Sequence, residues 1–427
     1  RALRQLVVGI TETNLVVHGE AAFRHGELDF GSLVEDGQTL GSVALLGFRI
    51  IDRELTQIGE EVAAQRNVLG GVHHRLAAGR AEQINTCIGC NQACLDHTFG
   101  GKITSCLVNP RACHETLMIE TPATFNDRVA IVGAGPAGLA FATTAARRGI
   151  DVTLFDAAAE IGGQFNIAKQ IPGKEEFHET LRYFKKQIEL TGVTLKLGHK
   201  VSVESLTKDG FKHVVLATGV TPRIPDIEGI EHTKVVGYLD VIRDKCKVGQ
   251  TVALIGAGGI GFDVAEYLIQ EGVSPSLEKD KFFSEWGVDI SYSNAGGLQA
   301  EHIEKSSRKV YLLQRKVGKV GDGLGKTTGW IHRTSLKKRE VEMVNGVTYH
   351  RVDDEGLHIT VGEKKMTILA DTVVLCAGQE PQRELQDGLV SAGCSVHLIG
   401  GAYKAEELDA KHAIKQGTEL ALTFGNV

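Results

Sequence analysis

The sequence predicts an α/β protein in which short, buried parallel strands alternate with helices. Apolar runs of four or five residues recur beside glycine-rich turns, which is typical of strands covered on both faces. Glycine supplies 51 of the 427 residues and proline only 8. This ratio favours close-approach turns over a disordered chain, in which both residues rise together. At about 150 residues per domain, the length predicts about three domains.

The charge balance excludes two classes of protein. Lysine and arginine total 47 against 53 acidic residues, a net charge of −6, which argues against a dedicated nucleic-acid binder and a polybasic membrane anchor. No apolar stretch reaches the roughly 20 residues of a membrane span, and no signal-peptide pattern opens the chain. Because the first residue is Arg1, we expect a fragment or a processed product.

The first complete motif begins with an apolar strand over 128–132 and a G-x-G-x-x-G turn. A helix over 139–147 and a second strand over 151–155 follow, and this strand ends at Asp156. The motif glycines are Gly133, Gly135 and Gly138. They allow the tight turn, the approach of backbone to a pyrophosphate, and close helix–strand packing. Because Asp156 suits a ribose 2′-hydroxyl, we predict FAD or NAD(H) here.

A second motif of the same kind follows a strand over 251–255 and leads into a helix over 262–270. Its glycines are Gly256, Gly258 and Gly261. After an insertion of about 35 residues, the next strand over 309–313 ends in Gln-Arg-Lys instead of an acid. Arg315 and Lys316 suit a 2′-phosphate, so this motif predicts NADPH. The alternative interpretation is a solvated basic turn.

Two similar segments, 213–219 and 372–378, each consist of a predicted strand followed by a glycine turn. They fit positions at which the chain passes from one nucleotide-binding domain to the other. The predicted fold is therefore a pair of Rossmann-like domains, the NADPH domain being inserted into the FAD domain. The glycine turn that contains Gln164 and the segment 395–401 are places where backbone could approach a flavin. The predicted domains are 81–121 for the cysteine-rich segment, 122–220 plus 365–427 for FAD, and 221–364 for NADPH.

Five of the eight cysteines fall between residues 87 and 113. Four of them have the spacing C-x2-C-x3-C-x11-C: Cys87, Cys90, Cys94 and Cys106. Four soft thiolates in this spacing favour a [4Fe–4S] cluster. A zinc site and unrelated buried thiols are the alternatives. Cys113 lies outside the motif and is interpreted as an ordinary structural thiol. An exposed cluster implies a reducing compartment, so we expect a cytoplasmic location.

The three predicted redox groups form a chain. NADPH delivers two electrons as hydride, a cluster carries one at a time, and a flavin exchanges between the two modes. We therefore expect electrons to pass from NADPH to FAD, then to the cluster, then to an acceptor.

From about residue 81 to 422 the chain resembles the bacterial NADPH-dependent 2,4-dienoyl-CoA reductases. These belong with the old-yellow-enzyme-like iron–sulfur flavoproteins, alongside trimethylamine dehydrogenase and enoate reductases. The stretches that carry the resemblance are 84–96, 104–115, 160–177, 312–316, 323–334 and 376–381. They include the segments N-T-C-I-G-C-N-Q-A-C and K-T-T-G-W-I-H-R-T.

The resemblance implies roles for individual residues. It implies a [4Fe–4S] cluster on the four spaced cysteines and NADPH at Arg315 and Lys316. It implies FAD at the first glycine motif, Asp156 and Gln164, and Val201 beside the adenine. The remaining implied contact is Trp330, with nicotinamide or substrate.

The family's N-terminal half is a (β/α)8 barrel that binds FMN and the acyl-CoA and supplies a Tyr and His proton-donor pair. Such a barrel needs about 250 residues, but only about 80 precede the cysteines. We interpret residues 1–80 as a truncated barrel remnant, with one matching stretch at 33–40. No FMN site or catalytic residue is recognisable, and the pair His73 and His74 is interpreted as part of a glycine-rich loop.

The predicted function is NADPH-dependent reduction of 2,4-dienoyl-CoA to enoyl-CoA in β-oxidation of unsaturated fatty acids, with an acyl-CoA thioester as substrate. One alternative is a stand-alone electron-transfer module that feeds a partner protein. Others are a related enone reductase or amine dehydrogenase and an inactive product.

Overall fold

The computed structural model describes residues 7–11, 14–18, 75–405 and 409–425. It divides into two units, residues 1–81 and 82–427. In the first unit, β1 (Val7–Thr11) and β2 (Asn14–His18) form an antiparallel pair. The predicted barrel match at 33–40 and the two adjacent histidines lie outside the described residues.

The second unit contains two lobes, each built on a parallel five-stranded sheet. The first sheet has the order β17-β6-β3-β4-β5, and all its neighbouring pairs are parallel. Its strands are β3 (Val129–Val132), β4 (Val152–Phe155), β5 (Thr194–Lys196), β6 (His213–Leu216) and β17 (Ser395–Leu398). The strands predicted at 128–132 and 151–155 are confirmed.

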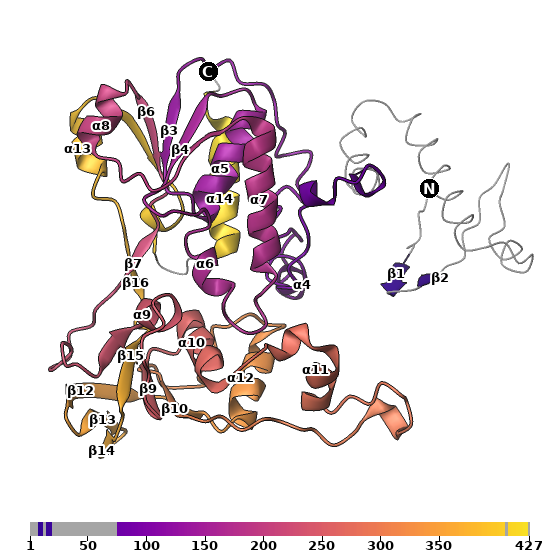
Figure 1. Ribbon diagram of the computed structural model, residues 1–427, viewed down its shortest axis with the longest axis vertical. Coiled ribbons are helices and arrows are strands. Elements are labelled where there is room, and N and C mark those ends of the chain that lie inside the picture. Colours follow the sequence, from indigo (N-terminus) through magenta and orange to yellow (C-terminus); the bar gives the residue numbers. More distant parts are fainter. Residues whose placement is uncertain (1–6, 12–13, 19–74, 406–408, 426–427) are drawn as a thin grey trace, which may run out of the picture. The chain divides into compact units, whose positions relative to one another are not determined.

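Helices cover both faces of this first sheet (Figure 1). They are α5 (Pro136–Arg147), α6 (Phe165–Ala168), α7 (Phe177–Thr191), α8 (Val203–Lys208), α13 (Gln386–Ser391) and α14 (Ala410–Thr423). A short 3-10 turn, η5 (Gly400–Ala402), precedes α14. On α7 the buried residues recur every fourth position, at Thr180, Phe184 and Ile188, which is the spacing of one helix face.

The second sheet has the order β11-β10-β9-β15-β8 and is also parallel. Its strands are β8 (Val235–Gly237), β9 (Thr251–Ile255), β10 (Lys309–Leu313), β11 (Glu342–Val344) and β15 (Thr372–Leu375). Its helices are α9 (Tyr238–Ile242), α10 (Gly259–Ile269), α11 (Lys279–Glu285) and α12 (Gly329–Lys338). Two 3-10 turns, η3 (Pro275–Leu277) and η4 (Ala295–Gly297), lie in the predicted insertion.

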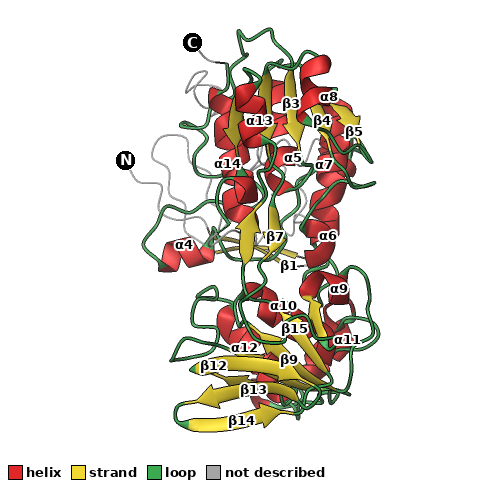
Figure 2. Cartoon of the chain, turned by 90° about the vertical axis from the view of Figure 1, so that its left-hand side faces the viewer, coloured by secondary structure: helices red, strands yellow, loops and turns green. Residues whose placement is uncertain are grey.

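An antiparallel sheet of β12 (Val347–Asp353), β13 (Gly356–Val361) and β14 (Lys364–Ile368) completes the second lobe (Figure 2). The sequence analysis assigns residue 365 onward to the first domain, but β15 pairs with β9 and β8 inside the second sheet. The chain returns to the first lobe only after β15. Both lobes place buried apolar strands beside a helix, so apolar character alone does not tell which sheet a strand joins.

A two-stranded ribbon carries both crossings between the lobes. In it, β7 (Val220–Pro222) pairs antiparallel with β16 (Gln379–Pro381). Arg223 Nε donates to the carbonyl oxygen of Ala377 at 2.9 Å beside this ribbon. Figure 2 shows β7 between the two lobes. We call residues 223–378 the second lobe, and residues 82–219 with 382–425 the first lobe.

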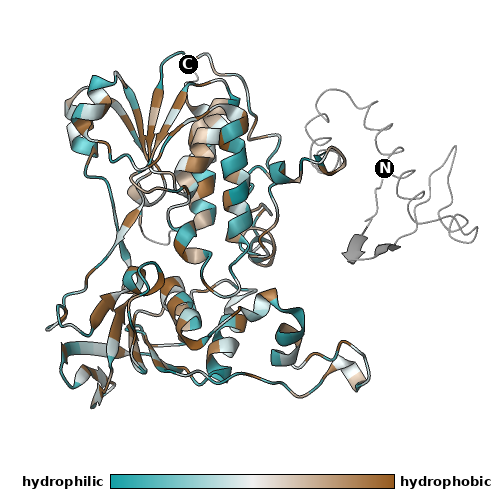
Figure 3. Cartoon of the chain, in the orientation of Figure 1, coloured by the Kyte–Doolittle hydropathy of each residue, from teal (hydrophilic) through white to brown (hydrophobic). Residues whose placement is uncertain are grey.

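The core of each lobe is apolar, and Figure 3 shows hydrophobic colouring concentrated on the central strands. In the first lobe, Ile131, Phe141 and Leu154 are fully buried. In the second, Leu254 and Phe262 are almost completely buried. Among the described helices, none combines the length and apolar character needed to cross a bilayer.

The cysteine segment, residues 84–121, belongs to the first lobe and contains α4 (Leu95–Phe99) after the short turn η2 (Ala81–Gln83). Asn85 Nδ2 donates to Val108 O at 2.7 Å and fastens the two ends of the cysteine motif together. Arg182 Nη2 on α7 donates to Ile84 O at 2.9 Å. The segment is therefore held by side chains rather than by a sheet.

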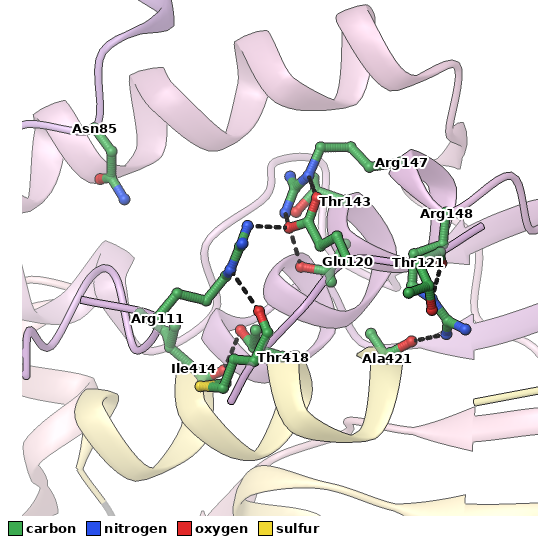
Figure 4. Close-up of polar contacts among 12 residues, drawn as sticks. Asn85, Arg111, Glu120, Thr121, Thr143, Arg147, Arg148, Ile414, Thr418 and Ala421 are labelled. Atoms are coloured by element: carbon green, nitrogen blue, oxygen red, sulfur yellow. Dashed lines mark hydrogen bonds and ion pairs between the residues drawn. The ribbon is translucent and has the colours of Figure 1, made fainter. Parts of the chain in front are cut away.

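A carboxylate shared by two arginines fastens the end of this segment to α5 (Figure 4). Glu120 pairs with Arg111 at 3.0 Å and with Arg147 at 2.8 Å. Burial opposes ionisation of Glu120, but the hydrogen bond and charge of Arg147, with those of Arg111, hold its pKa below the ordinary value of 4.5. The ionised carboxylate therefore stabilises the folded state.

Glu120→Gln is expected to lower the free energy of unfolding by about 1–2 kcal/mol at pH 7, because charge-assisted hydrogen bonds to two arginines are lost. A carboxyl whose folded pKa is depressed contributes stability above its ordinary pKa, and this contribution is lost as the pH falls through the folded pKa. The difference between variant and parent should therefore shrink below about pH 4. Urea unfolding at both pH values measures this, and a difference independent of pH would contradict the interpretation.

Candidate functional site: two glycine turns and a cysteine cluster

The first glycine turn joins β3 to α5 and leaves open space at the helix N-terminus. Gly133 has φ +111°, and a Cβ there would lie 2.3 Å from the carbonyl oxygen of Ala217. A Cβ on Gly138 would lie 1.9 Å from Gly133 O, whereas one on Gly135 would meet nothing within 4 Å. The outer two glycines are therefore required by packing, and the middle one faces free space suited to a phosphate.

This division predicts opposite behaviour for two alanine variants. Gly138→Ala should destabilise the first lobe by several kcal/mol, because a backbone oxygen occupies the space that its Cβ needs. Gly135→Ala should leave the melting temperature of the FAD-free protein unchanged and weaken FAD binding by about tenfold or more, because its Cβ occupies the free space. Thermal unfolding and flavin titration separate the two effects. Equal loss of stability in both variants would contradict the assignment.

The other predicted FAD residues gather around the same turn. The carboxylate of Asp156, just after β4, accepts the backbone N–H of Ala134 at 2.6 Å and that of Ala158 at 2.7 Å. Gly162 N–H donates to Ala134 O at 2.8 Å, which brings the turn containing Gln164 against the glycine loop. The structure thus places Asp156 and the Gln164 turn beside the first glycine turn.

Val201 is buried in the apolar cluster that also contains Phe155, the last residue of β4. Its predicted place beside the adenine stays a prediction.

The second glycine turn repeats the geometry of the first. Gly256 has φ +113°, and its Cβ would lie 2.3 Å from Cys376 O; a Cβ on Gly261 would lie 1.9 Å from Gly256 O. A Cβ on Gly258 would again meet nothing within 4 Å. The two motifs therefore build two equivalent turns with open space at the middle glycine, each at the N-terminus of a helix of eleven or twelve residues.

Arg315 and Lys316 follow β10 and are exposed. In the part of the chain that the structure describes, neither side chain makes a hydrogen bond or ion pair. They follow the carboxyl end of β10, which is parallel to β9, so they share a sheet edge with the second glycine turn. Trp330, the second residue of α12, is 53% exposed and stacks edge-on against Trp286 at 6.2 Å.

The four spaced cysteines lie near one another and are free thiols. Burial raises the pKa of the Cys90 thiol, and the neighbouring thiols of Cys106, Cys94 and Cys87 raise it further. Cys106 behaves in the same way, and its pKa is raised mainly by burial. Cys113 is an exposed free thiol. Its exclusion from the ligand set stays a prediction.

Backbone N–H groups point at these sulfur atoms. The backbone N–H of Gln92 donates to the sulfur of Cys90. The backbone N–H groups of Val108 and Asn109 donate to the sulfur of Cys106. Each of these hydrogen bonds lowers the pKa of its thiol, against the effect of burial. Gly89 N–H lies 3.4 Å from Cys87 Sγ. Donors arranged in this way stabilise thiolates, the form that binds metal.

The sequence does not predict the part that Tyr238 plays in this region. Its hydroxyl accepts the side-chain amide of Gln379 at 2.9 Å and also hydrogen-bonds with Gln164. Burial raises the pKa of this tyrosine. The three residues come from α9, the ribbon and the first lobe, and no sequence signal connects positions so far apart.

A cavity of about 250 Å³ lies at the C-terminal end of α10, where Gln270, Glu285 and Arg339 are among its lining residues. The second glycine turn is at the opposite end of that helix. The cavity is therefore not the nucleotide site. The candidate positions for the nucleotide phosphates are the open spaces at the two glycine turns.

Comparison with known proteins agrees with this geometry. The chain is 32% identical over 352 residues to a metal reductase of Desulforamulus reducens, a match that covers 79% of this chain and 50% of that protein. It is 30% identical to an NADH oxidase of Thermoanaerobacter brockii, covering 80% and 48%. The chain thus spans about half the length of the curated relatives it matches.

Among solved structures, 2-naphthoyl-CoA reductase in complex with 2-naphthoyl-CoA superposes with a TM-score of 0.70 at 27% identity, covering 83% of this chain and 49% of that one. The model of the pyridine nucleotide-disulphide oxidoreductase family matches residues 127–403, which include both glycine turns and both sheets. The match supports binding of FAD and NAD(P)H. With two Rossmann-like lobes and this match, the chain belongs to the pyridine nucleotide-disulphide oxidoreductase family.

Proposed function

We propose that this chain is the electron-supplying part of an NADPH-dependent iron–sulfur flavoprotein oxidoreductase. One observation supports it most strongly: two equivalent glycine turns and a group of four free cysteines occur in one structural unit. Bound FAD would accept hydride from NADPH and release electrons singly, and a cluster would carry them onward. The residues of the chain bind and orient these groups.

In the first lobe, the Gly135 turn would receive the FAD pyrophosphate at the N-terminus of α5. Asp156 would accept from the ribose hydroxyls, in place of one of its present backbone partners. In the second lobe, the Gly258 turn would receive the NADPH pyrophosphate. Arg315 and Lys316 would hold the 2′-phosphate, because they are exposed cations whose side chains make no hydrogen bond or ion pair with the described residues.

The cysteine group fits a [4Fe–4S] cluster better than one zinc ion. Structural zinc usually takes two well-separated C-x2-C pairs. Here three of the four thiols fall within the eight residues from Cys87 to Cys94. This spacing suits a cluster in which each iron takes one thiolate.

For the complete protein we propose reduction of a conjugated acyl-CoA thioester, with 2,4-dienoyl-CoA of unsaturated fatty acid β-oxidation as the substrate and an FMN domain as the immediate electron acceptor. The resemblance of segments such as 323–334 and the likeness to 2-naphthoyl-CoA reductase support this. A second proposal is an electron-transfer module that serves a separate partner protein. The presence of both nucleotide turns and the cysteines in one unit favours it.

The test is a cofactor analysis of the chain purified without oxygen. Flavins are released and separated while iron and sulfide are counted in the same sample. About one FAD and about four irons per chain are expected. Stoichiometric zinc with no iron would reject the cluster. FAD without FMN would favour the module, and equal amounts of FAD and FMN would favour the reductase.

A further inference from the structure

Helix α4 of the cysteine segment is hydrogen-bonded to a loop of the second lobe. Asp96 lies on α4, two residues after Cys94, and its Oδ1 accepts two hydrogen bonds from Thr327. The backbone N–H and the hydroxyl of Thr327 each donate at 2.8 Å. Beside them, the Lys326 ammonium lies 3.4 Å from Phe99 O. A loop of the second lobe is thus hydrogen-bonded to the helix that follows the third cysteine of the motif.

The loop is shaped for this contact. A Cβ on Gly325 would lie 2.7 Å from Asp96 Oδ2 and 3.1 Å from the Thr328 hydroxyl, so a larger residue would push the carboxylate away. Asp96 and Thr327 are both half-buried. Water competes less for a partly buried, charge-assisted pair of hydrogen bonds than for an exposed one. Both Asp96 and the loop that contains Thr327 are therefore arranged for this contact.

Each partner is firmly attached to its own lobe. The cysteine segment is tied to α7 by Arg182 and to α5 by Glu120. The loop leads directly into α12, which contacts α10, and its Leu324 packs on the core of the second lobe. The Asp96–Thr327 contact therefore joins the frame of the first lobe to the start of α12.

The polypeptide connection between the lobes consists of two short strands. Only the three-residue strands β7 and β16 cross between them. A short two-stranded ribbon can bend or twist, so contacts away from it must fix the angle between the lobes. Lys174 with Asp263 at 2.5 Å is one such contact, on the side of α10. Asp96 with Thr327 is another, on the side of α12.

We propose that Asp96 is a positioning residue that holds the NADPH-binding lobe in one orientation relative to the FAD-binding lobe through Thr327. This rests on the proposed function, because hydride transfer needs nicotinamide and flavin in a fixed relation. Asp96 itself touches neither nucleotide turn.

Hydrogen exchange of the FAD-loaded protein tests the contact without turnover. In Asp96→Ala, peptides covering 323–329 should exchange at least tenfold faster, because the Thr327 amide loses its acceptor. Thr327→Val removes the hydroxyl donor and should show a smaller increase. The matched control is Thr328→Val, since the Thr328 side chain makes no capping hydrogen bond at the start of α12. It should exchange like the parent.

Rapid mixing with NADPH then tests positioning. In Asp96→Ala the limiting rate of flavin reduction should fall at least tenfold while the NADPH concentration for half-maximal rate changes less than twofold. Flavin and iron content should stay at parent levels. Asp96→Asn keeps an acceptor oxygen and should restore the rate to within about threefold.

An unchanged limiting rate with faster exchange would overturn the positioning role, and unchanged exchange would overturn the contact itself. Loss of flavin or iron in step with the rate would assign Asp96 a purely structural role and also overturn the proposal. If the parent protein is not reduced by NADPH at all, the proposed function fails, and the exchange experiment still decides whether the contact exists.

Discussion

Cys90→Ser is expected to abolish iron–sulfur absorption and to leave FAD bound in full. Cys90 sits among three other motif thiols, and its sulfur accepts a backbone N–H. A serine hydroxyl is not ionised near neutral pH and is a hard oxygen ligand, so one corner of the cluster loses its thiolate. The first glycine turn, where we propose that FAD binds, joins β3 to α5, which the substitution does not touch. Iron analysis and released-flavin analysis on one sample measure both effects.

Cys113→Ser is the matched control, because Cys113 is an exposed thiol in the same segment that lies outside the spaced motif. It should keep the iron content of the parent. If Cys113→Ser lost iron as completely as Cys90→Ser, the ligand assignment would be wrong. If Cys90→Ser lost FAD as well, the first lobe would depend on the cluster for its folding.

Arg315→Glu is expected to lower kcat/KM for NADPH by about 100-fold or more and to change kcat/KM for NADH by less than about threefold. The substitution removes a cation from the 2′-phosphate and places a like charge beside it, a change of several kcal/mol that acts only on the phosphorylated nucleotide. Steady-state kinetics with both nucleotides and an artificial acceptor measure the ratio.

Lys319→Glu makes the same change of charge in the same exposed loop, after the two predicted contact residues. It should affect both nucleotides weakly and equally. Equal losses of kcat/KM for NADPH and NADH in Arg315→Glu would contradict the 2′-phosphate assignment. The turn after β10 would then be a solvated basic turn, the alternative given by the sequence.

Sequence reasoning predicts most accurately where a local motif fixes the backbone. The run from β3 through the first glycine turn to α5 and β4 could be predicted directly, because the glycine spacing and the flanking apolar strands are local in the sequence. The same holds for β9, the second glycine turn and β10. These features depend on residues close together in the chain.

Contacts between distant segments could not be predicted in this way. Asp96 and Thr327 are 231 positions apart, and an aspartate early in a short helix is ordinarily interpreted as a favourable charge near the helix N-terminus. Tyr238 on α9 and Gln379 in the ribbon are 141 positions apart in the chain. The sequence places β15 in the first domain, whereas β15 pairs with β8 and β9 in the second sheet, because its apolar run fits either sheet.

We propose that NADPH electrons entering this chain reach the four-cysteine site through FAD. The most direct measurement adds two equivalents of NADPH to the oxygen-free protein, because full reduction of FAD takes two electrons and reduction of a cluster takes one. Flavin absorbance and low-temperature electron paramagnetic resonance are recorded on the same sample. We expect bleaching of the flavin together with the signal of a reduced [4Fe–4S] cluster, and Cys90→Ser should keep the bleaching and lose the signal. Full bleaching with no cluster signal in the parent protein would contradict electron transfer from FAD to the cysteine site.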